Sequence, residues 1–289
     1  MKTLRFILLS VLLPLWLSAQ AAPSPRSTAL RLDHVVDFSH AGRSDIHEGS
    51  LRLGRISSTQ VRARSVLSVP VNDQNQFLAG VAAQWLKFDP PATSLVPSSL
   101  TAVAARLGWN HTTATPWTFR AEVDPGVYGA GSFGAPVALR AIYASSRELQ
   151  WAIGLNYDWR SRHPLVGGIG VRWQFAPDWT LSLLLPAPRV EWTIGPRLSL
   201  FAGATLQGGT FRVADNFGRT RGRPAFDGQT VDYREITLAA GVRWQASPAT
   251  TLHLGVGATT DRRFEFSDRD LLLNGDGAPA LQLTFTSAY

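Results

Sequence analysis

Leu281-Gln-Leu-Thr-Phe-Thr-Ser-Ala-Tyr289, the last stretch of the chain, alternates apolar and polar side chains and stops on an aromatic residue. Successive side chains of a β-strand point to opposite faces, so a period of two predicts a strand with one apolar and one polar face. Many upstream segments repeat this alternation. The end of the chain therefore predicts an all-β protein.

The alternation continues backward from the terminus through most of the chain. Strands are predicted around residues 252–258, 235–245, 198–206, 190–194, 179–185, 169–175, 149–159, 137–143 and 117–123, with less regular ones at 99–109 and 76–88. Residues 49–69 form either one long strand or a hairpin around Ser57-Ser58. The total is about twelve strands, within a range of about ten to fourteen, and an even number is expected of a closed bacterial barrel.

The segments between the predicted strands alternate in length. Longer connections lie at 89–98, 124–136, 160–167, 214–230 and 262–279, with Pro186-Ala187-Pro188 as a short exception. Short turns lie between them, at 110–116, 145–148, 176–178, 195–196 and 246–249. Outer-membrane barrels place short turns in the periplasm and long loops outside, so this alternation fits a barrel of that kind.

The N-terminus has the order of a secretory signal. Lys2 and Arg5 precede the apolar run from Phe6 to Leu17, and Ala19-Gln20-Ala21 supplies small residues for cleavage. The apolar run is shorter than the ~20 residues that a helix needs to cross a bilayer. We expect residues 1–21 to be a cleaved signal peptide, residues 22–48 a short polar periplasmic segment, and residues 49–289 the barrel.

The composition leaves two β architectures open. The chain has 25 Gly, 10 Trp, 14 Phe, 17% charged residues and no Cys, which excludes disulfides and thiolate metal sites. After the signal, no apolar run is long enough for a membrane helix, and a closed barrel is the other structure that pairs every backbone amide in lipid. A soluble β-sandwich would also alternate, and the positions of the tryptophans distinguish the two.

Tryptophans gather at predicted strand ends, next to the short turns. An indole ring prefers the headgroup boundary, so tryptophans at a common depth form an aromatic belt, whereas a sandwich would bury most of them centrally. We therefore predict a transmembrane up-and-down antiparallel β-barrel in a bacterial outer membrane. Its belt comprises Trp109, Trp117, Trp173, Trp179, Trp192 and Trp244.

One specific stretch resembles a known family. The pattern Arg-Trp-Gln…Pro-Asp-Trp-Thr-Leu…Pro-x-Pro-Arg-Val-Glu-Trp, from Arg172 to Trp192, is similar to an uncharacterised family of Gram-negative outer-membrane barrels known only as a domain of unknown function. The resemblance implies insertion by the outer-membrane barrel assembly machinery. The aromatic C-terminal signal for that machinery would consist of Leu281, Leu283, Phe285 and Tyr289, although such signals commonly end in Phe. No catalytic residue comes with the family.

The faces opposite the apolar ones point into the predicted barrel, where charges are tolerated. Arginines outnumber acids there, and two interpretations stay open. The lumen is either a wet pore with a positive field that favours anions, or a narrow interior filled and braced by an ion-pair network. In both interpretations the same lumen-facing residues are involved, either in selecting solutes or in plugging the interior. They are Arg106, Arg120, Glu122, Arg140, Arg172, Arg189, Glu191 and Arg243.

The sequence predicts a passive role. We expect a narrow channel for small anionic or neutral solutes, or a structural barrel, with a barrel enzyme acting on lipid or peptide at the outer rim as the alternative. No Gly-x-Ser-x-Gly or His-Glu-x-x-His motif occurs, so we expect no catalytic residues and no enzymatic activity. The net charge of +7 comes with no nucleic-acid-binding module, so nucleic acid is not an expected partner.

Metals, cofactors and partners are the last predictions. His34, His40 and His47 stand among several acids without a spacing that defines one site, so we expect no metal and no cofactor. Outer-membrane lipid and lipopolysaccharide are the expected partners, with Arg219-Thr-Arg-Gly-Arg223 in an outer loop as a candidate contact for phosphates. The oligomeric state does not follow from the sequence.

Overall fold

A computed structural model describes residues 29–289 except residue 93, so the predicted signal peptide, residues 1–21, lies outside the described residues. No helix in this described part is long and apolar enough to cross a membrane. The strands are β1 (Arg31–Glu48), β2 (Leu51–Asn72), β3 (Asn75–Phe88), β4 (Ser99–Thr112), β5 (Trp117–Val123), β6 (Gly126–Tyr128), β7 (Phe133–Gly134), β8 (Val137–Ala144), β9 (Leu149–Tyr157), β10 (Leu165–Ala176), β11 (Trp179–Ser182), β12 (Arg189–Gly195), β13 (Leu198–Arg212), β14 (Thr230–Ser247), β15 (Thr250–Phe266), β16 (Leu271–Gly275) and β17 (Ala278–Ala288). Short 3₁₀ turns, η1 (Arg219–Arg221), η2 (Pro224–Phe226) and η3 (Ser267–Arg269), lie in the loops.

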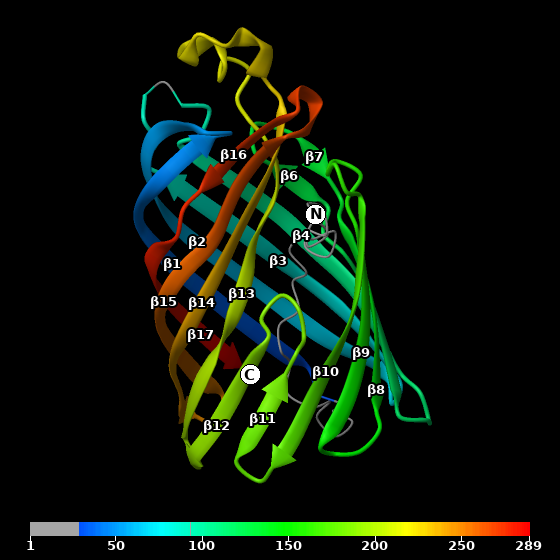
Figure 1. Cartoon of the computed structure of the whole chain (residues 1–289). Coiled ribbons are helices and arrows are strands. Elements are labelled where there is room, and N and C mark those ends of the chain that lie inside the picture. The colour runs from blue at the N-terminus through cyan, green and yellow to red at the C-terminus, as the bar shows by residue number, and fades with distance from the viewer. Residues whose placement is uncertain (1–28, 93) are drawn as a thin grey trace, which may run out of the picture.

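These strands form one antiparallel sheet that closes on itself (Figure 1). Each strand pairs with its neighbours in the sequence, and β17 pairs with β1 from Asp33 to Ala41 to complete the ring. Three crossings are interrupted, so that β5 continues as β6, β7 as β8, and β16 as β17. The described residues therefore cross the barrel wall fourteen times. The predicted all-β antiparallel barrel is confirmed.

The predicted count of about twelve strands is wrong, and the error lies in the N-terminal boundary. Residues 31–48, assigned to the polar segment 22–48, form β1, so the barrel begins at Arg31 rather than at residue 49. Residues 49–69 contribute to the single strand β2 and not to a hairpin. The polar residues of β1 belong to a strand because Asp37 faces the interior opposite Arg62 of β2, where charge is tolerated.

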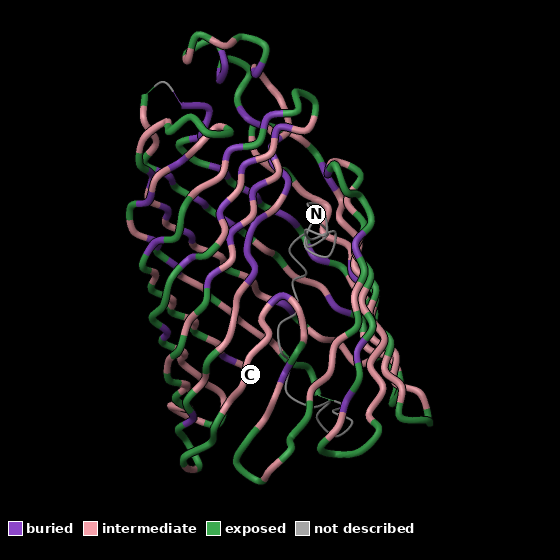
Figure 2. The backbone as a smooth tube through the Cα atoms, viewed as in Figure 1, coloured by how far each residue is buried: buried purple, intermediate pink, exposed green. Residues whose placement is uncertain are grey.

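The outward face of the barrel is apolar. Exposed fractions reach 72% for Ile169, 62% for Val256 and 64% for Val103, although these residues belong to paired strands. Exposed and less exposed residues follow one another along the strands (Figure 2). A soluble protein rarely exposes a continuous apolar surface of this extent, whereas lipid requires one. The outward face therefore fits contact with a bilayer.

The two ends of the barrel differ. At the turn end, strands are joined by the short connections 73–74, 113–116, 145–148, 177–178, 196–197 and 248–249. At the loop end, opposite, lie the connections 89–98, 158–164 and 213–229. The six predicted belt tryptophans lie toward the turn end, where Trp179 and Trp192 stack with ring centroids 5.7 Å apart.

The barrel wall is shortest at the β11–β12 hairpin, where β11 has 4 residues and β12 has 7. β10 pairs with β9 along its length from Leu165 to Trp173, but with β11 only from Arg172 to Ala176. The connection 183–188 folds against β10, and a Cβ atom built at Gly170 would lie 2.7 Å from a methyl carbon of Leu184. Glycine at this position lets the connection pack closely where the strand partner stops.

The C-terminal residues complete the ring. Leu281, Leu283 and Phe285 are on the outward face of β17, between β15 and β1. Tyr289 follows the strand, and its backbone exchanges two hydrogen bonds with Leu32, at 2.8 and 3.0 Å. The last predicted strand is therefore paired on both sides, and its role as an assembly signal stays a prediction.

If the outward face contacts lipid, a charged side chain placed on it should destabilise the fold more at the middle of the bilayer than near its surface. Val256→Arg, on the apolar band beside Leu281, is expected to lower the free energy of unfolding in phospholipid vesicles by ~2–4 kcal/mol. Leu51→Arg, at an equally exposed site beside the loop-end turn, is expected to have little effect. Urea unfolding followed by tryptophan fluorescence measures both, and equal losses would contradict a lipid-facing surface.

Candidate functional site: the barrel interior

The loop end of the interior is filled by apolar side chains, which we call the apolar cap. At its centre the ring of Phe88 lies 5.0 Å from those of Tyr233 and Phe264, and all three residues are at most 3% exposed. The cap comprises Ile46, Ile56, Leu86, Phe88, Leu95, Val96, Leu100, Ala102, Phe211, Val213, Phe217, Phe226, Val231, Tyr233, Phe264, Phe266, Leu271 and Leu273. It is packed like the core of a soluble protein.

Two loops complete the apolar cap. Leu95 and Val96 reach into it from the connection 89–98, and Phe217 and Phe226 reach into it from the connection 213–229. The rings of Phe217 and Phe226 lie 6.0 and 5.3 Å from the ring of Phe266. Packed side chains therefore close the interior at the loop end.

The connection 213–229 is also braced by polar contacts. The backbone N–H of Arg219 donates to Asp227 over 2.8 Å, and the Arg219 side chain forms an ion pair with the same carboxylate. The backbone hydrogen bond and, after it, the guanidinium hold the pKa of Asp227 below its usual value. The Arg219-Thr-Arg-Gly-Arg223 stretch is thus held by contacts within the protein, and Arg223 pairs with Glu48 at 3.0 Å.

A buried polar layer lies beneath the apolar cap. Arg262 is fully buried, and its guanidinium donates to Glu235 over 2.9 Å and to Ser58 over 3.1 Å. Tyr233 also donates its hydroxyl proton to Glu235, over 3.0 Å. These contacts tie β2, β14 and β15 together across the interior, and sequence reasoning did not find them.

Further toward the turn end, three arginines surround one acid in what we call the Glu122 cluster. Arg120 and Arg140 donate to the Glu122 carboxylate over 2.7 and 2.6 Å, and a guanidinium nitrogen of Arg106 lies 3.7 Å from it. Arg106 also forms a bidentate pair with Asp124, at 2.8 and 2.6 Å. Strands β4, β5 and β8 supply these residues, so the ladder register brings the charges together.

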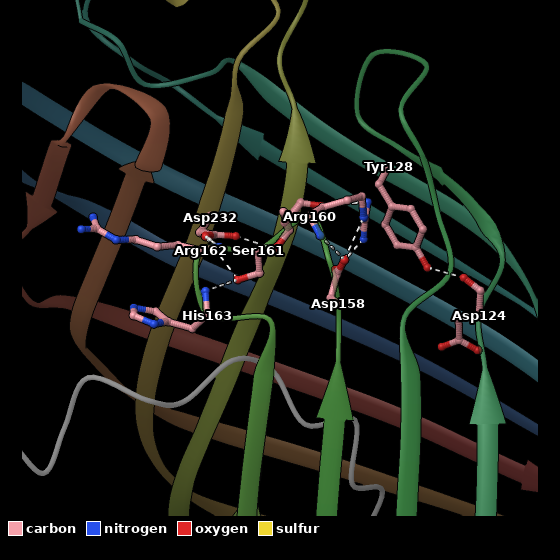
Figure 3. A network of polar contacts seen from close by, with 9 residues as sticks. Asp124, Tyr128, Asp158, Arg160, Ser161, Arg162, His163 and Asp232 are labelled. Atoms are coloured by element: carbon pink, nitrogen blue, oxygen red, sulfur yellow. Dashed lines mark hydrogen bonds and ion pairs between the residues drawn. The ribbon is translucent and has the colours of Figure 1, made fainter.

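A loop lies beside this cluster and bridges the wall between β10 and β13 (Figure 3). Arg160, in the connection 158–164, pairs with Asp158 and donates to the backbone carbonyl of Thr210 on β13 over 3.3 Å. Ser161 and the backbone of Arg162 donate to Asp232 on β14, over 3.4 and 3.2 Å. The connection 158–164 therefore fastens the β9–β10 side of the barrel to the β13–β14 side, above the low part of the wall.

A cavity of about 110 Å³ lies between this loop, the apolar cap and the Glu122 cluster. Ala102, Ala104 and Phe211 give it apolar walls, and Arg106 and Arg140 reach it from the cluster. The space suffices for a few water molecules or a very small solute.

A second charged group, the Glu191 cluster, lies nearer the turn end. Arg243 donates to Glu191 over 2.8 Å, and Arg189 lies 3.5 Å from the same carboxylate. The side chains of Arg189 and Arg243 remain 24% and 36% exposed, so they reach an open part of the lumen. Arg172 is in the neighbouring wall and forms no ion pair among the described residues.

The eight lumen-facing residues predicted from the sequence are all on the inner side of their strands. The structure joins Arg106, Arg120 and Arg140 to Glu122, and Arg189 and Arg243 to Glu191, while Arg172 stands apart. Sequence reasoning missed the apolar cap. Its signal was present, because Phe211, Val231 and Tyr233 place apolar groups on the inward positions of their strands.

Three residues whose side chains could bind a metal ion lie close together at the loop end. Ligand atoms of Asp45, His47 and Asp276 all lie within 4.8 Å of one another. Arg52 and Arg55 already bind the Asp45 carboxylate, at 2.8 and 3.2 Å. His34 and His40, the other histidines considered from the sequence, bond instead to Ser65 and Thr59.

Comparison with known proteins gives distant structural matches. No family model and no curated protein sequence matches the chain, so the resemblance of residues 172–192 to an uncharacterised family is unconfirmed. A mutant of the monoaromatic hydrocarbon channel TodX aligns over 91% of each chain at 9% identity and a TM-score of 0.49. An outer membrane channel from Pseudomonas putida F1 aligns over 93% of this chain and all of the other, at 9% identity and a TM-score of 0.49.

The KdgM porin, solved with oligogalacturonate, aligns over 88% of this chain and 99% of its own at 7% identity, with a TM-score of 0.37. All three are channels or porins by name. The likeness is too distant to assign this chain a family or a solute.

The Glu122 cluster predicts a large effect of one uncharged substitution. Glu122→Gln removes the acid that Arg106, Arg120 and Arg140 share, and removal of one partner from a buried ion pair costs roughly 3–5 kcal/mol. Asp89→Asn removes the partner of Arg43 in an exposed pair, and stability should stay close to that of the wild type. Urea unfolding in vesicles compares the variants, and similar stabilities would show that Glu122 does not hold the cluster together.

Proposed function

We propose that this protein is a passive outer-membrane channel for small solutes, anionic or neutral, whose outer mouth is closed by the apolar cap. The observation that supports the channel best is the lumen between the turn end and the cap, where arginines exceed the acids that pair with them. Arg64 and Arg172 carry charge without an ion-pair partner among the described residues. A wet lumen with such a lining has a positive field, which favours anions over cations.

The outward apolar face and the tryptophans toward the turn end support insertion in the outer membrane. In that orientation the turn end faces the periplasm and the loop end faces outward. Residues 1–21 would direct export, and Leu281, Leu283, Phe285 and Tyr289 would be read by the barrel assembly machinery. Lipopolysaccharide would surround the loop end as a partner.

The charged clusters do not by themselves fill the interior in this proposal. Their ion pairs lie along the wall, and part of each arginine in the Glu191 cluster is exposed to the lumen. The apolar cap is the barrier, because water and ions enter packed apolar regions at high cost. Since two of its aromatic rings belong to the connection 213–229, displacement of that loop would open the channel.

Planar-bilayer recording tests the channel and its barrier together. The wild-type protein is expected to give small or infrequent conductance steps with a preference for anions. The double variant Phe217→Ser/Phe226→Ser removes two rings from the apolar cap and is expected to give larger or more frequent steps. The preference for anions is read from the reversal potential in a salt gradient.

The matched control is Ala225→Ser, an exposed apolar-to-serine change in the same loop. Its conductance should equal that of the wild type. Folding of every variant is checked by heat-modifiable migration on gels. A double variant that is folded yet gives no steps would overturn the channel, and steps that prefer cations would overturn the solute class.

A further inference from the structure

One row of inward side chains crosses three neighbouring strands at the Glu191 cluster. Arg172 of β10 is directly opposite Ser182 of β11, and Ser182 is directly opposite Arg189 of β12. Directly opposed side chains have Cβ atoms ~5 Å apart, so the two arginines begin about 10 Å from each other with the serine between them. Both guanidinium groups can therefore reach the space above Ser182.

The serine in the middle of this row lacks a partner. Ser182 is 4% exposed, and its hydroxyl oxygen makes no hydrogen bond among the described residues. Buried polar atoms are normally paired, and exceptions in native structures often mark a place for a water, an ion or a ligand. A hydroxyl flanked by two guanidinium groups is suited to donate its proton to an anion.

The charges of the row are also incompletely balanced. Glu191 forms ion pairs with both Arg189 and Arg243. Arg172 forms no ion pair with any residue that the structure describes. Two guanidinium groups thus share one carboxylate, and the third has none. An additional anion between Arg172 and Arg189 would supply the missing negative charge without displacing Glu191.

Small residues continue the row beyond Arg189. On the far side of Arg189 the register continues through Gly203 of β13 and Ala239 of β14. A Cβ atom built at Gly203 would lie 2.6 Å from the Cβ of Arg189, so a larger residue at 203 would crowd the arginine. Glycine at 203 therefore lets Arg189 keep its place in the row.

We propose that Arg172, Ser182 and Arg189 form an oxyanion-binding site, the anion cradle, which holds the carboxylate or phosphate group of a small solute. The planar guanidinium fork matches the paired oxygens of both groups, and the serine hydroxyl donates to a further oxygen. The cradle deepens the proposed function, because it names the chemical group by which the channel would select a solute. Its binding at equilibrium is measured apart from conduction.

Isothermal titration calorimetry on the detergent-solubilised protein tests the cradle. Inorganic phosphate and acetate are titrated separately at constant ionic strength, with chloride as the reference anion. Saturable binding is expected for at least one of the oxyanions and not for chloride. Arg172→Gln should weaken that binding by about tenfold or more, because it removes a charged donor, and Ser182→Ala should weaken it by less.

The matched control is Arg64→Gln. Arg64 faces the lumen from β2, across the barrel from β10, and it likewise forms no ion pair among the described residues. The substitution removes the same charge from the lumen but not from the cradle, so binding should stay within about twofold of the wild type. Equal losses in Arg64→Gln and Arg172→Gln would overturn the cradle in favour of a general positive field.

The two proposals can fail separately. If neither phosphate nor acetate binds saturably to the folded wild-type protein, the cradle is wrong, even where bilayers show an anion-preferring conductance. If oxyanions bind with the expected dependence on Arg172 but the opened variant conducts nothing, the cradle stands and the channel does not. The oxyanion that binds more tightly identifies the group of the solute.

Discussion

Closure of the backbone hydrogen-bond ladder is the constraint on which the other features of this protein depend. An unpaired backbone N–H or C=O group in hydrocarbon costs several kcal/mol, so a sheet can face lipid only as a ring without edges. The β1–β17 pairing and the two Leu32–Tyr289 hydrogen bonds close that ring. Once it is closed, alternation follows along each regular stretch of strand, because each residue has either lipid or the lumen beside it. A bulge, such as the one where β14 and β15 shift register between Ile236 and Thr237, moves the alternation by one residue.

The same constraint explains the construction of the lowest part of the wall. From Leu165 to Val171, β10 has no strand partner on the side that faces β11 among the described residues. Two connections occupy this place: residues 183–188 pack on Gly168 and Gly170, and residues 158–164 reach over to β13 and β14. The loops thus supply part of what the ladder of a longer hairpin would supply. The backbone N–H of Leu183 donates to the carbonyl of Val171 over 2.7 Å, and those of Ala204 and Leu206 donate to the carbonyls of Pro188 and Pro186.

How much the sequence revealed depends on whether the signal was local. Between bulges the period of two fixes the face of each side chain, so the outward set around Ile169 and the inward position of Arg172 follow from a few residues of sequence. Strand β1 was missed because its acids and its three histidines, His34, His40 and His47, gave it the composition of a polar leader. The Glu122 cluster could be foreseen only in part, since Arg106 and Arg140 meet Glu122 through the register of separate strands, which alternation does not specify.

The apolar cap divides the interior into two regions with different physics. Below it, fixed charges line the lumen. Within it, Phe88, Tyr233 and Phe264 pack against one another with almost no exposed surface. Those three belong to strands paired on both sides, so moving them would break long ladders. Phe217 and Phe226 are held by side-chain packing and by the contacts of their loop alone, which are individually weak. If the barrel conducts, the strands therefore keep their register, and the connection 213–229 is a part of the cap that can move without breaking a ladder.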